Sequence, residues 1–486
     1  MPKVPPRLAL FQATFLTLFL ASFPPLASAL PPLHDGAKFE PEDGFVLHGA
    51  GQDQEAFDLY EQALEGPSVA PFITKEYAAV WDRWPMLWSQ GAITWDELDA
   101  FYFQPLRDWF GAQTGRMPEL SLGYALYNGT FGDQVIPTGV LDPVIAELAA
   151  IVMEFEEPCF VRPGFEPSAD KYTPGAPYIQ SYRRIVDIFR REGVDNAAFI
   201  WCAGPGGGLQ LAKQDLWFPG DAYVDWIGID LFTPESIRPA PGSPLQWADS
   251  TWAMLRLADA WKKPVILSET SAVFPGGITD PGPDAAQLYW DEWFEPFFDL
   301  VRSEPRVKAF AYLNWDWPDH GFPWVDSRIE NNRALAGMLS AELSDPMYLH
   351  RDTPDKFQRP WLVDLGGKVW TGEGVQVHVE NALQGPLGGE IMFVMGTQRI
   401  VTPGTAGYLD HSYGTPVPGT DQSWFVDTPN TLLPLDMVGR DGRYSLDFEV
   451  PTLTALTDVT FYLQAIVHDP DEGLFVTQPY ELHIRP

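Results

Sequence analysis

The sequence predicts an α/β protein: a (β/α)8 barrel, the TIM-barrel fold, followed by a smaller C-terminal all-β sandwich domain. Between about residues 45 and 345, eight short apolar runs alternate with amphipathic stretches. Strands that alternate with helices form parallel βαβ units, and eight such units fit a closed barrel. Beyond residue 373, apolar and polar residues alternate strictly, which is typical of antiparallel strands with one exposed face.

The predicted barrel strands are the eight apolar runs, at residues 45–48, 69–73, 120–126, 159–161, 198–201, 226–229, 265–267 and 309–313. Helices are expected near residues 54–65, 139–156, 182–193, 245–261, 284–303 and 329–343. In the third of these stretches apolar residues recur at helical spacing, and arginines cover the opposite face. No G-x-G-x-x-G motif opens a helix after the first strand, so a dinucleotide-binding fold lacks its main signal.

The chain is expected to divide into a signal peptide at 1–29, the barrel at 36–350, a linker at 351–372 and the sandwich at 373–486. Lys3 and Arg7 precede the apolar run Leu8–Ala21, and Ala27–Ala29 offers a small-residue cleavage site. We therefore expect a secreted, periplasmic or cell-surface protein with no stable membrane insertion once the signal is removed. A retained N-terminal anchor is the alternative.

The net charge, the histidines and the aromatic content indicate which kinds of ligand and partner to expect. The formal net charge of −35 repels nucleic acid and anionic lipid, so no nucleic-acid partner is expected. The eight histidines are scattered and no H-E-x-x-H motif is present, so neither a metal nor another cofactor is predicted. Aromatic residues make up 14% of the chain, and aromatics beyond the needs of the core often line grooves that grip sugars.

The two cysteines are expected to be free. Cys159 opens the fourth predicted strand and Cys202 closes the fifth. If these strands are parallel neighbours, the two sulfurs lie at opposite ends, roughly 20 Å apart, which is too far for a disulfide.

Two glutamates stand where buried strands give way to loops. Glu166 follows the fourth apolar run, and Glu269 ends the seventh. Catalytic groups of (β/α)8 barrels lie at the carboxyl ends of the strands. Two carboxyl groups about 5 Å apart are the equipment of a retaining glycosidase, in which one is the acid/base and the other the nucleophile. An ion pair or a helix cap is the structural alternative for either residue.

The segments around these glutamates resemble glycoside hydrolase family 26, whose best-known members are β-mannanases. Arg162–Glu166 (RPGFE) is similar to the acid/base segment of that family, and Lys263–Glu269 (KPVILSE) to its nucleophile strand. Tyr182–Arg190, Asn196–Trp201 and Phe218–Asp230 extend the similarity, which covers roughly residues 45–345. The resemblance implies a (β/α)8 barrel with a double-displacement mechanism.

Carried over residue by residue, the resemblance makes Glu166 the acid/base and Glu269 the nucleophile, with Arg162 orienting or tuning the carboxylates. Three features depart from the family pattern. Pro167–Asp170 stands where mannanases usually have an Asn-bearing loop after the acid/base. Phe165 stands where mannanases usually have His, and Phe232 stands where many have a Tyr that hydrogen-bonds the nucleophile. These departures leave the substrate open.

The remaining candidates for substrate contact are Asp230 and Phe232, near the sixth strand end, and four aromatic residues elsewhere: Tyr172, Trp201, Trp315 and Trp317. Asp230 fits substrate contact and local hydrogen bonding equally well. The sequence thus predicts a secreted retaining glycoside hydrolase, an endo-β-glycanase that cleaves β-mannan or a related β-linked polysaccharide. The alternative is an inactive barrel that binds polysaccharide or is associated with the cell surface.

Overall fold

The structure is a computed structural model of the 486-residue chain. It describes residues 37–351 apart from 42–43, 65–68, 156, 205–213, 238–245, 274–277 and 279–281, and strands between 361 and 485. The chain divides into two compact units, Lys38–Gln358 and a second unit made mainly of Arg359–Thr405 and Leu409–Pro486. The predicted signal peptide and most of the predicted linker lie outside the described residues.

The first unit is a closed parallel barrel, as predicted. Its eight strands are β1 (Val46–Gly51), β2 (Ile73–Ala79), β3 (Met117–Gly123), β6 (Cys159–Pro163), β7 (Ala197–Ala203), β8 (Trp226–Leu231), β9 (Val265–Thr270) and β10 (Val307–Leu313). They are hydrogen-bonded in this order, and β10 pairs with β1 to close the ring. The short β11 (Tyr348–Leu349) adds to the outer edge of β1.

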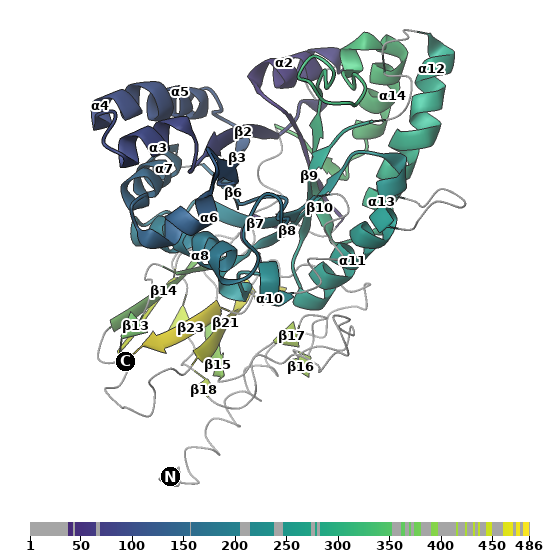
Figure 1. The fold of residues 1–486 in the computed structure, drawn as a ribbon. Coiled ribbons are helices and arrows are strands. Elements are labelled where there is room, and N and C mark those ends of the chain that lie inside the picture. Colours follow the sequence, from purple (N-terminus) through teal and green to yellow (C-terminus); the bar gives the residue numbers. More distant parts are fainter. Residues whose placement is uncertain are drawn as a thin grey trace. The chain divides into compact units, whose positions relative to one another are not determined.

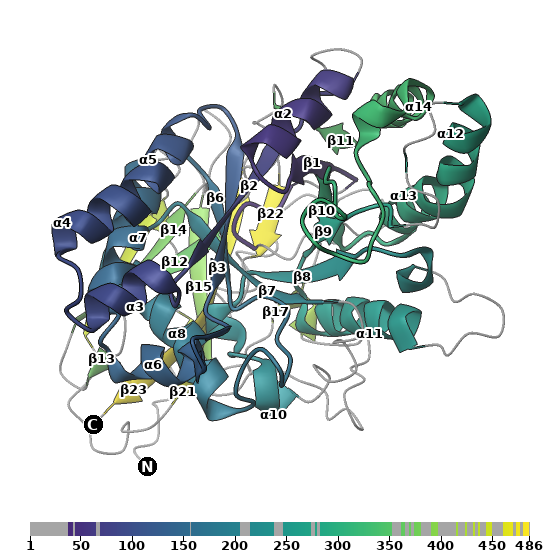
Figure 2. The ribbon, with the colours of Figure 1, turned by 45° about the horizontal axis from the view of Figure 1, so that its top comes forward.

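The helices lie outside the ring of strands (Figures 1 and 2). They are α2 (Gln54–Ala63), α3 (Arg83–Ser89), α4 (Trp95–Leu98), α5 (Gln104–Gly111), α6 (Gly132–Val135), α7 (Asp142–Phe155), α8 (Ala176–Arg191), α10 (Gln214–Trp217), α11 (Gln246–Trp261), α12 (Pro283–Tyr289), α13 (Glu295–Ser303) and α14 (Arg333–Leu343). Short 3-10 or π segments, among them η2 (Asp99–Phe103), η6 (Trp290–Phe294) and η7 (Ile329–Asn331), join some of them. In the described chain, the hairpin β4 (Leu126–Tyr127) and β5 (Thr130–Phe131) follows β3.

Two predictions about this unit were wrong in detail. The second strand was placed at residues 69–73 but runs over Ile73–Ala79, because Lys75 and Glu76 interrupt the apolar pattern that was used to find it. Helices α3–α6 and α10 and the hairpin of β4 and β5 were not predicted. The other strands and helices lie within a few residues of their expected positions, although α8 begins at Ala176, six residues before the predicted start at residue 182.

Close packing between strands explains why position 49 of β1 is a glycine. A β-carbon at Gly49 in β1 would lie 2.6 Å from the β-carbon of Ile73 and 2.9 Å from the carbonyl oxygen of Phe310. Both distances are too short for any side chain, so β1 can approach its two neighbours closely only with glycine there.

The described strands of the second unit are largely antiparallel. The sheet β12-β14-β20 joins Trp361–Asp364, Gly374–Glu380 and Tyr444–Glu449. A larger sheet contains β13 (Val369–Trp370), β15 (Glu390–Gly396), β18 (Thr431–Leu432), β19 (Asp436–Met437), β21 (Thr460–Asp469), β22 (Gly473–Val476) and β23 (Tyr480–Arg485). A separate ribbon pairs β16 (Thr415–Pro416) with β17 (Ser423–Trp424). The two alternating stretches near residues 444–450 and 459–467 are strands β20 and β21, as expected. The packing of these sheets into a sandwich stays a prediction.

Candidate active site

A buried guanidinium organises the centre of the candidate site. Arg162 lies in β6, and its side chain is fully excluded from solvent. Its Nε lies 3.0 Å from Glu119 Oε1 and its Nη1 lies 3.4 Å from Asp230 Oδ1, while Nη2 donates to Glu269 Oε1. The guanidinium therefore joins strands β3, β6, β8 and β9 through three carboxyl groups.

A second cation completes this cluster. Lys75, in β2, places Nζ 2.7 Å from Glu119 Oε1 and donates to the carbonyl oxygen of Ser268 at 2.7 Å. Both Lys75 and Glu119 have fully buried side chains. Burying charges costs several kcal/mol per ion unless they are paired and hydrogen-bonded, so these five side chains form one interdependent unit.

Asp230 behaves as the neutral member of the cluster. Burial, and then the nearby charge of Glu269, raise the pKa of Asp230 well above its usual value. The Cys202 thiol donates to Asp230 Oδ1 at 3.3 Å. Burial and the proximity of Asp230 also raise the pKa of this thiol. The raised pKa values favour the protonated forms of both Asp230 and Cys202, next to the charged members of the cluster.

Glu269 has the opposite tendency. Burial alone raises the pKa of its carboxyl, but the charges of Arg162 and Lys75 outweigh burial and the net pKa is lowered. The Tyr77 hydroxyl donates to Glu269 Oε1 at 2.9 Å. Glu269 is thus held as a carboxylate, the state that nucleophilic attack requires.

Glu166 lies just beyond β6, in a backbone conformation that is rare for a residue with a side chain. Its φ is +51°, and its N–H donates to the carbonyl oxygen of Cys202 at 3.1 Å. Its Oε2 lies 2.6 Å from Lys171 Nζ. Burial alone would lower the pKa of Lys171, but the charge of Glu166 raises it, and the net pKa is raised. Strain of this kind clusters at functional sites and persists only where the surroundings enforce it.

The surroundings of Glu166 leave little free space. A β-carbon on Gly204 would lie 2.5 Å from Glu166 Oε1, so a larger residue there would have to displace the carboxyl group. On the other side, the Phe165 ring lies 4.5 Å from the guanidinium carbon of Arg162. The Phe165 ring thus covers the buried guanidinium.

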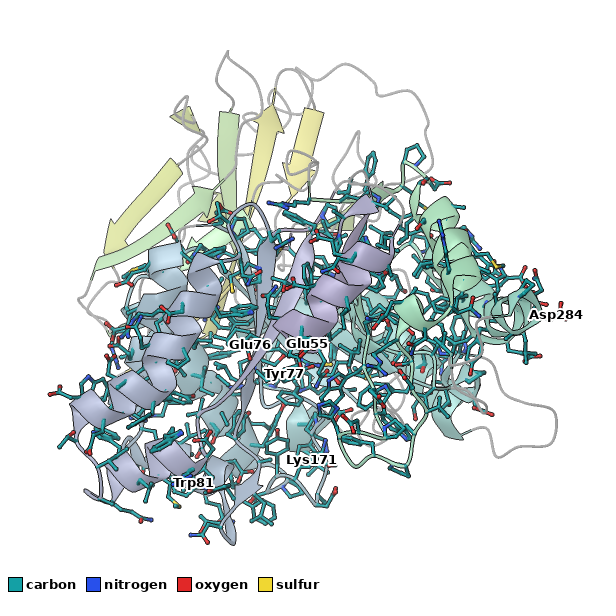
Figure 3. All side chains as sticks on the ribbon, turned by 90° about the horizontal axis from the view of Figure 1, so that it is seen from above. Glu55, Glu76, Tyr77, Trp81, Lys171 and Asp284 are labelled. Atoms are coloured by element: carbon teal, nitrogen blue, oxygen red, sulfur yellow. The ribbon has the colours of Figure 1, made fainter. Side chains whose placement is uncertain are left out.

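Both predicted catalytic glutamates therefore lie at the carboxyl ends of barrel strands, β6 and β9, with β7 and β8 between them. Figure 3 views the barrel unit from above and labels one partner of each, Tyr77 and Lys171, in its central part. Asp284, at the start of α12, lies at the edge of the same view.

The predicted aromatic contacts near β8 and β10 differ in exposure. Phe232 and Trp317 are buried in an apolar cluster with Val273 and Leu313. The Trp317 indole N–H lies 3.0 Å from the hydroxyl oxygens of both Ser271 and Ser327. Trp315 is only partly buried and stacks on the ring of His320 with 3.9 Å between centroids. Of the three, only Trp315 has an exposed part, whereas Phe232 and Trp317 are enclosed in the cluster.

The structure buries both Tyr172 and Trp201, which were predicted to contact substrate. The Tyr172 ring packs between Tyr124 and Tyr178, and its hydroxyl donates to the carbonyl oxygen of Phe165. Trp201 is fully buried against Phe218 and Trp261 of α11. Side chains enclosed in this way support the wall of the barrel and offer no face to a ligand.

Sequence reasoning missed four side chains that contact the candidate residues, namely Lys75, Tyr77, Glu119 and Lys171. Lys75 and Tyr77 were overlooked because β2 was placed too early. Glu119 precedes the apolar run at 120–126 by one residue, and a carboxylate at that position reads as a strand boundary. Lys75 and Tyr77 are two positions apart, so their side chains lie on the same face of a strand. That spacing was the signal that could have found these two residues.

Both cysteines are free and buried, in agreement with the prediction. In the part of the chain that the structure describes, no three His, Cys, Asp or Glu side chains gather in a way suited to a metal ion. No single helix among the described residues is both long and apolar enough to cross a membrane. The bent pair Gly132–Thr138 and Asp142–Phe155 meets the criteria of length and composition only when taken together.

Three curated relatives are similar to parts of the chain. A β-1,3-xylanase from Vibrio sp. is 26% identical over 246 residues, which is 45% of this chain and 51% of the relative. A β-1,3-xylanase from Alcaligenes sp. is 25% identical over 213 residues, or 39% of this chain and 42% of the relative. Endoglucanase H from Acetivibrio thermocellus is 28% identical over 156 residues, 29% of this chain and 17% of the relative. The chain thus spans about half, or less, of the length of these relatives.

Solved structures also match. A modular endo-β-1,4-mannanase from Cellulomonas fimi, described as a family 26 mannanase, is 16% identical with a TM-score of 0.43, over 94% of this chain and 100% of that chain. The catalytic domain of a family 26 endo-β-1,4-mannanase from Bacillus sp. JAMB-750 is 16% identical with a TM-score of 0.40, over 63% of this chain and 86% of that chain. No protein-family model matches the chain. The sequence relatives are glycoside hydrolases, which confirms the resemblance at that level.

Proposed function

We propose that this protein is a retaining glycoside hydrolase that cleaves a β-linked polysaccharide by double displacement. One observation carries the proposal: Glu269 is held as a carboxylate at the end of β9 by Arg162 and Tyr77, while Glu166 stands at the end of β6. An ionised carboxylate and a second carboxyl group at the mouth of one barrel are what the retaining mechanism requires.

In this mechanism Glu269 attacks the anomeric carbon while Glu166 gives a proton to the departing glycosidic oxygen. The glycosyl–Glu269 ester is then hydrolysed by a water molecule from which Glu166 takes a proton. Arg162 stays charged throughout and compensates the carboxylate of Glu269 before attack. Trp315, the partly exposed indole at the end of β10, is the proposed platform for a sugar ring.

The substrate class is a neutral β-glycan. The strongly negative chain disfavours acidic polysaccharides, and the relatives named above are β-1,3-xylanases and an endoglucanase. Phe165 and Phe232 differ from the usual mannanase residues, so β-1,3-xylan and β-glucans belong in the test beside β-mannans.

We also propose that residues 1–29 direct export and that residues 373–486 fold as a β-sandwich. The antiparallel pairing of β14 with β20 and of β15 with β21 supports the sandwich. Amino-terminal sequencing of protein recovered from outside the producing cell tests the first point, with a new terminus near residue 30 as the expected result.

The decisive test of activity is release of reducing ends from β-1,3-xylan, β-mannans and β-glucans. Glu269→Ala and Glu166→Ala should each abolish turnover, while Glu192→Ala, at the end of α8 and away from the site, should not. Initial hydrolysis products followed by proton NMR should keep the β-anomeric configuration. Inversion, or full turnover in Glu269→Ala, would contradict the mechanism.

Azide separates the two roles. With an activated aryl glycoside, whose leaving group needs no proton, Glu166→Ala still forms the glycosyl–Glu269 ester, and azide attacks it to give a β-glycosyl azide. In Glu269→Ala it takes the place of the missing nucleophile and gives an α-glycosyl azide. The same anomer from both variants would refute the assignment.

One observation favours the alternative of an inactive, polysaccharide-binding barrel. Lys171 Nζ lies 2.6 Å from Glu166 Oε2, and this ion pair ties the carboxyl group to a neighbouring side chain. If no glycan is cleaved but one is retained in affinity electrophoresis, and Trp315→Ala abolishes that retention, the binding role is correct.

A further inference from the structure

Tyr77 reaches the proposed nucleophile from an unexpected strand. It lies in β2 (Ile73–Ala79), and its hydroxyl donates to Glu269 Oε1 in β9 at 2.9 Å. A second acceptor, Gln52 Oε1, lies 3.2 Å from the same hydroxyl. The contact spans 192 positions in the sequence, so only barrel closure brings the two groups together.

The two oxygens of Glu269 have different surroundings. Tyr77 and Arg162 both donate to Oε1. Within the described residues, no side-chain hydrogen bond reaches Oε2. A carboxylate fixed through one oxygen presents the other in a defined direction, and the attacking atom of a nucleophile must be placed to within about 0.5 Å.

Phe232 cannot supply a comparable hydrogen bond. Its ring carries no donor, and it packs edge-to-face on Trp317 with 5.6 Å between centroids and against Trp324 at 4.7 Å. Phe232 brings no hydroxyl to Glu269. Tyr77 supplies one instead.

The Tyr77 ring is itself held in place. Its centroid lies 5.8 Å from that of Phe165 in an edge-to-face arrangement, 5.9 Å from the Arg162 guanidinium carbon and 5.8 Å from Lys75 Nζ. Burial, and then the charge of Glu269, raise the pKa of the phenol well above its usual value. The group therefore remains a hydroxyl, and a donor, throughout the working range of pH.

We propose that Tyr77 is the positioning residue of the nucleophile: its hydroxyl fixes Glu269 Oε1 so that Oε2 faces the anomeric carbon. This inference rests on the proposed glycosidase function. When Oε2 becomes esterified, Oε1 turns from a carboxylate oxygen into an ester carbonyl and accepts more weakly. The hydroxyl can then turn to Gln52, which eases formation of the ester, and it returns to Oε1 when the carboxylate is released.

The test replaces Tyr77 by Phe, which removes the hydroxyl and keeps the ring. Tyr102→Phe is the matched control, because the Tyr102 hydroxyl donates at 2.9 Å to the carbonyl oxygen of Ala79, at the end of the same strand but away from Glu269. Loss of a hydrogen bond to a charged group predicts a fall in kcat of about 10- to 100-fold for Tyr77→Phe, with KM changed less than about threefold. The control should keep kcat.

A second measurement does not depend on turnover. The carboxyl carbons of glutamate, labelled with carbon-13, are titrated by NMR, and Glu269→Gln identifies the signal of Glu269. Tyr77→Phe should raise the pKa of Glu269 by roughly 0.5–1 unit, because a donor to the charged form is lost while Arg162, Lys75 and Asp230 stay in place. Tyr102→Phe should leave the titration unchanged.

The two readouts separate the two ideas. If wild-type protein cleaves glycans but Tyr77→Phe keeps its kcat, the positioning role is wrong and the glycosidase stands. An unshifted Glu269 titration in Tyr77→Phe overturns the contact itself. If the titration shifts but wild-type protein cleaves no glycan, the proposed function fails, and with it the catalytic purpose of the contact.

Discussion

The buried guanidinium of Arg162 makes the sharpest prediction about stability. Arg162→Met keeps most of the side-chain volume and removes the charge. Around it, Lys75 remains with Glu119 and Glu269, while burial and Glu269 favour the neutral form of Asp230. Two cations and two carboxylates thus become one cation and two carboxylates, and one buried negative charge loses its partner.

Breaking a buried ion pair by removing one partner costs about 3–5 kcal/mol. Unfolding of a barrel of about 320 residues has an entropy near 2.1 cal/mol/K per residue, so this loss corresponds to a Tm lower by roughly 4–7 °C at pH 7. The uncompensated carboxyl also gains a raised pKa in the folded protein. The folded state then binds more protons than the unfolded chain, so the penalty shrinks as the pH falls from 7 toward 5.

Thermal unfolding followed by circular dichroism at pH 7 and pH 5 measures both effects. Arg184→Met is the matched control, because Arg184 pairs with Asp142 at 2.6 Å on the surface, with a third of its side chain exposed. Exposed pairs contribute about 0–1 kcal/mol, so the control should move Tm by less than about 2 °C at either pH. An equal Tm for Arg162→Met and wild-type protein at pH 7 would refute this account of the cluster.

Three further perturbations test other parts of the barrel unit. Gly204→Ala should cut kcat at least about tenfold with little change in Tm, because its β-carbon would displace the carboxyl group of Glu166. Burial, and then its histidine neighbour, hold the pKa of His48 well below 6.5. The unfolded chain therefore binds the extra proton, and stability should fall as the pH drops below 6.5, by at most about 1.4 kcal/mol per pH unit, and fall less in His48→Gln. Trp317→Ala should cost about 3–5 kcal/mol of stability, whereas Trp315→Ala should chiefly raise KM.

Each of these has its own control or contrary result. Gly337→Ala, in α14, places a β-carbon with nothing within 4 Å and should leave kcat unchanged. If Tm does not change between pH 7 and pH 5, the lowered pKa of His48 is wrong. If Trp315→Ala lowers Tm as much as Trp317→Ala does, then Trp315 is a packing residue like Trp317 and not a platform for a sugar ring.

The barrel could be predicted from sequence because seven of its strands contain a short apolar run and are buried along almost their whole length. The eighth case, β2, shows where this reasoning fails. Lys75 and Glu76 break its apolar pattern, yet Lys75 is fully buried because Glu119 neutralises it. Pairing between side chains 44 positions apart leaves no periodic trace in a single sequence.

The two glutamates were found for a related reason. A carboxylate at the end of an apolar strand contrasts with its neighbours, so Glu166 and Glu269 stand out in the chain. Tyr77 and Tyr172 do not, because tyrosine fits both packing and hydrogen bonding. Only the three-dimensional arrangement separates the tyrosine that donates to a carboxylate from the one that packs in a cluster of rings.

The charge cluster also bears on how the chain folds. Lys75, Glu119, Arg162, Asp230 and Glu269 come from five different strands, and the Arg162–Glu269 contact spans 107 positions. An assembly of the first strands alone would bury Arg162 without Glu269, at a large electrostatic cost. Partly formed barrels that lack β9 are therefore expected to be less stable than the closed barrel, because they leave Arg162 without the carboxylate of Glu269.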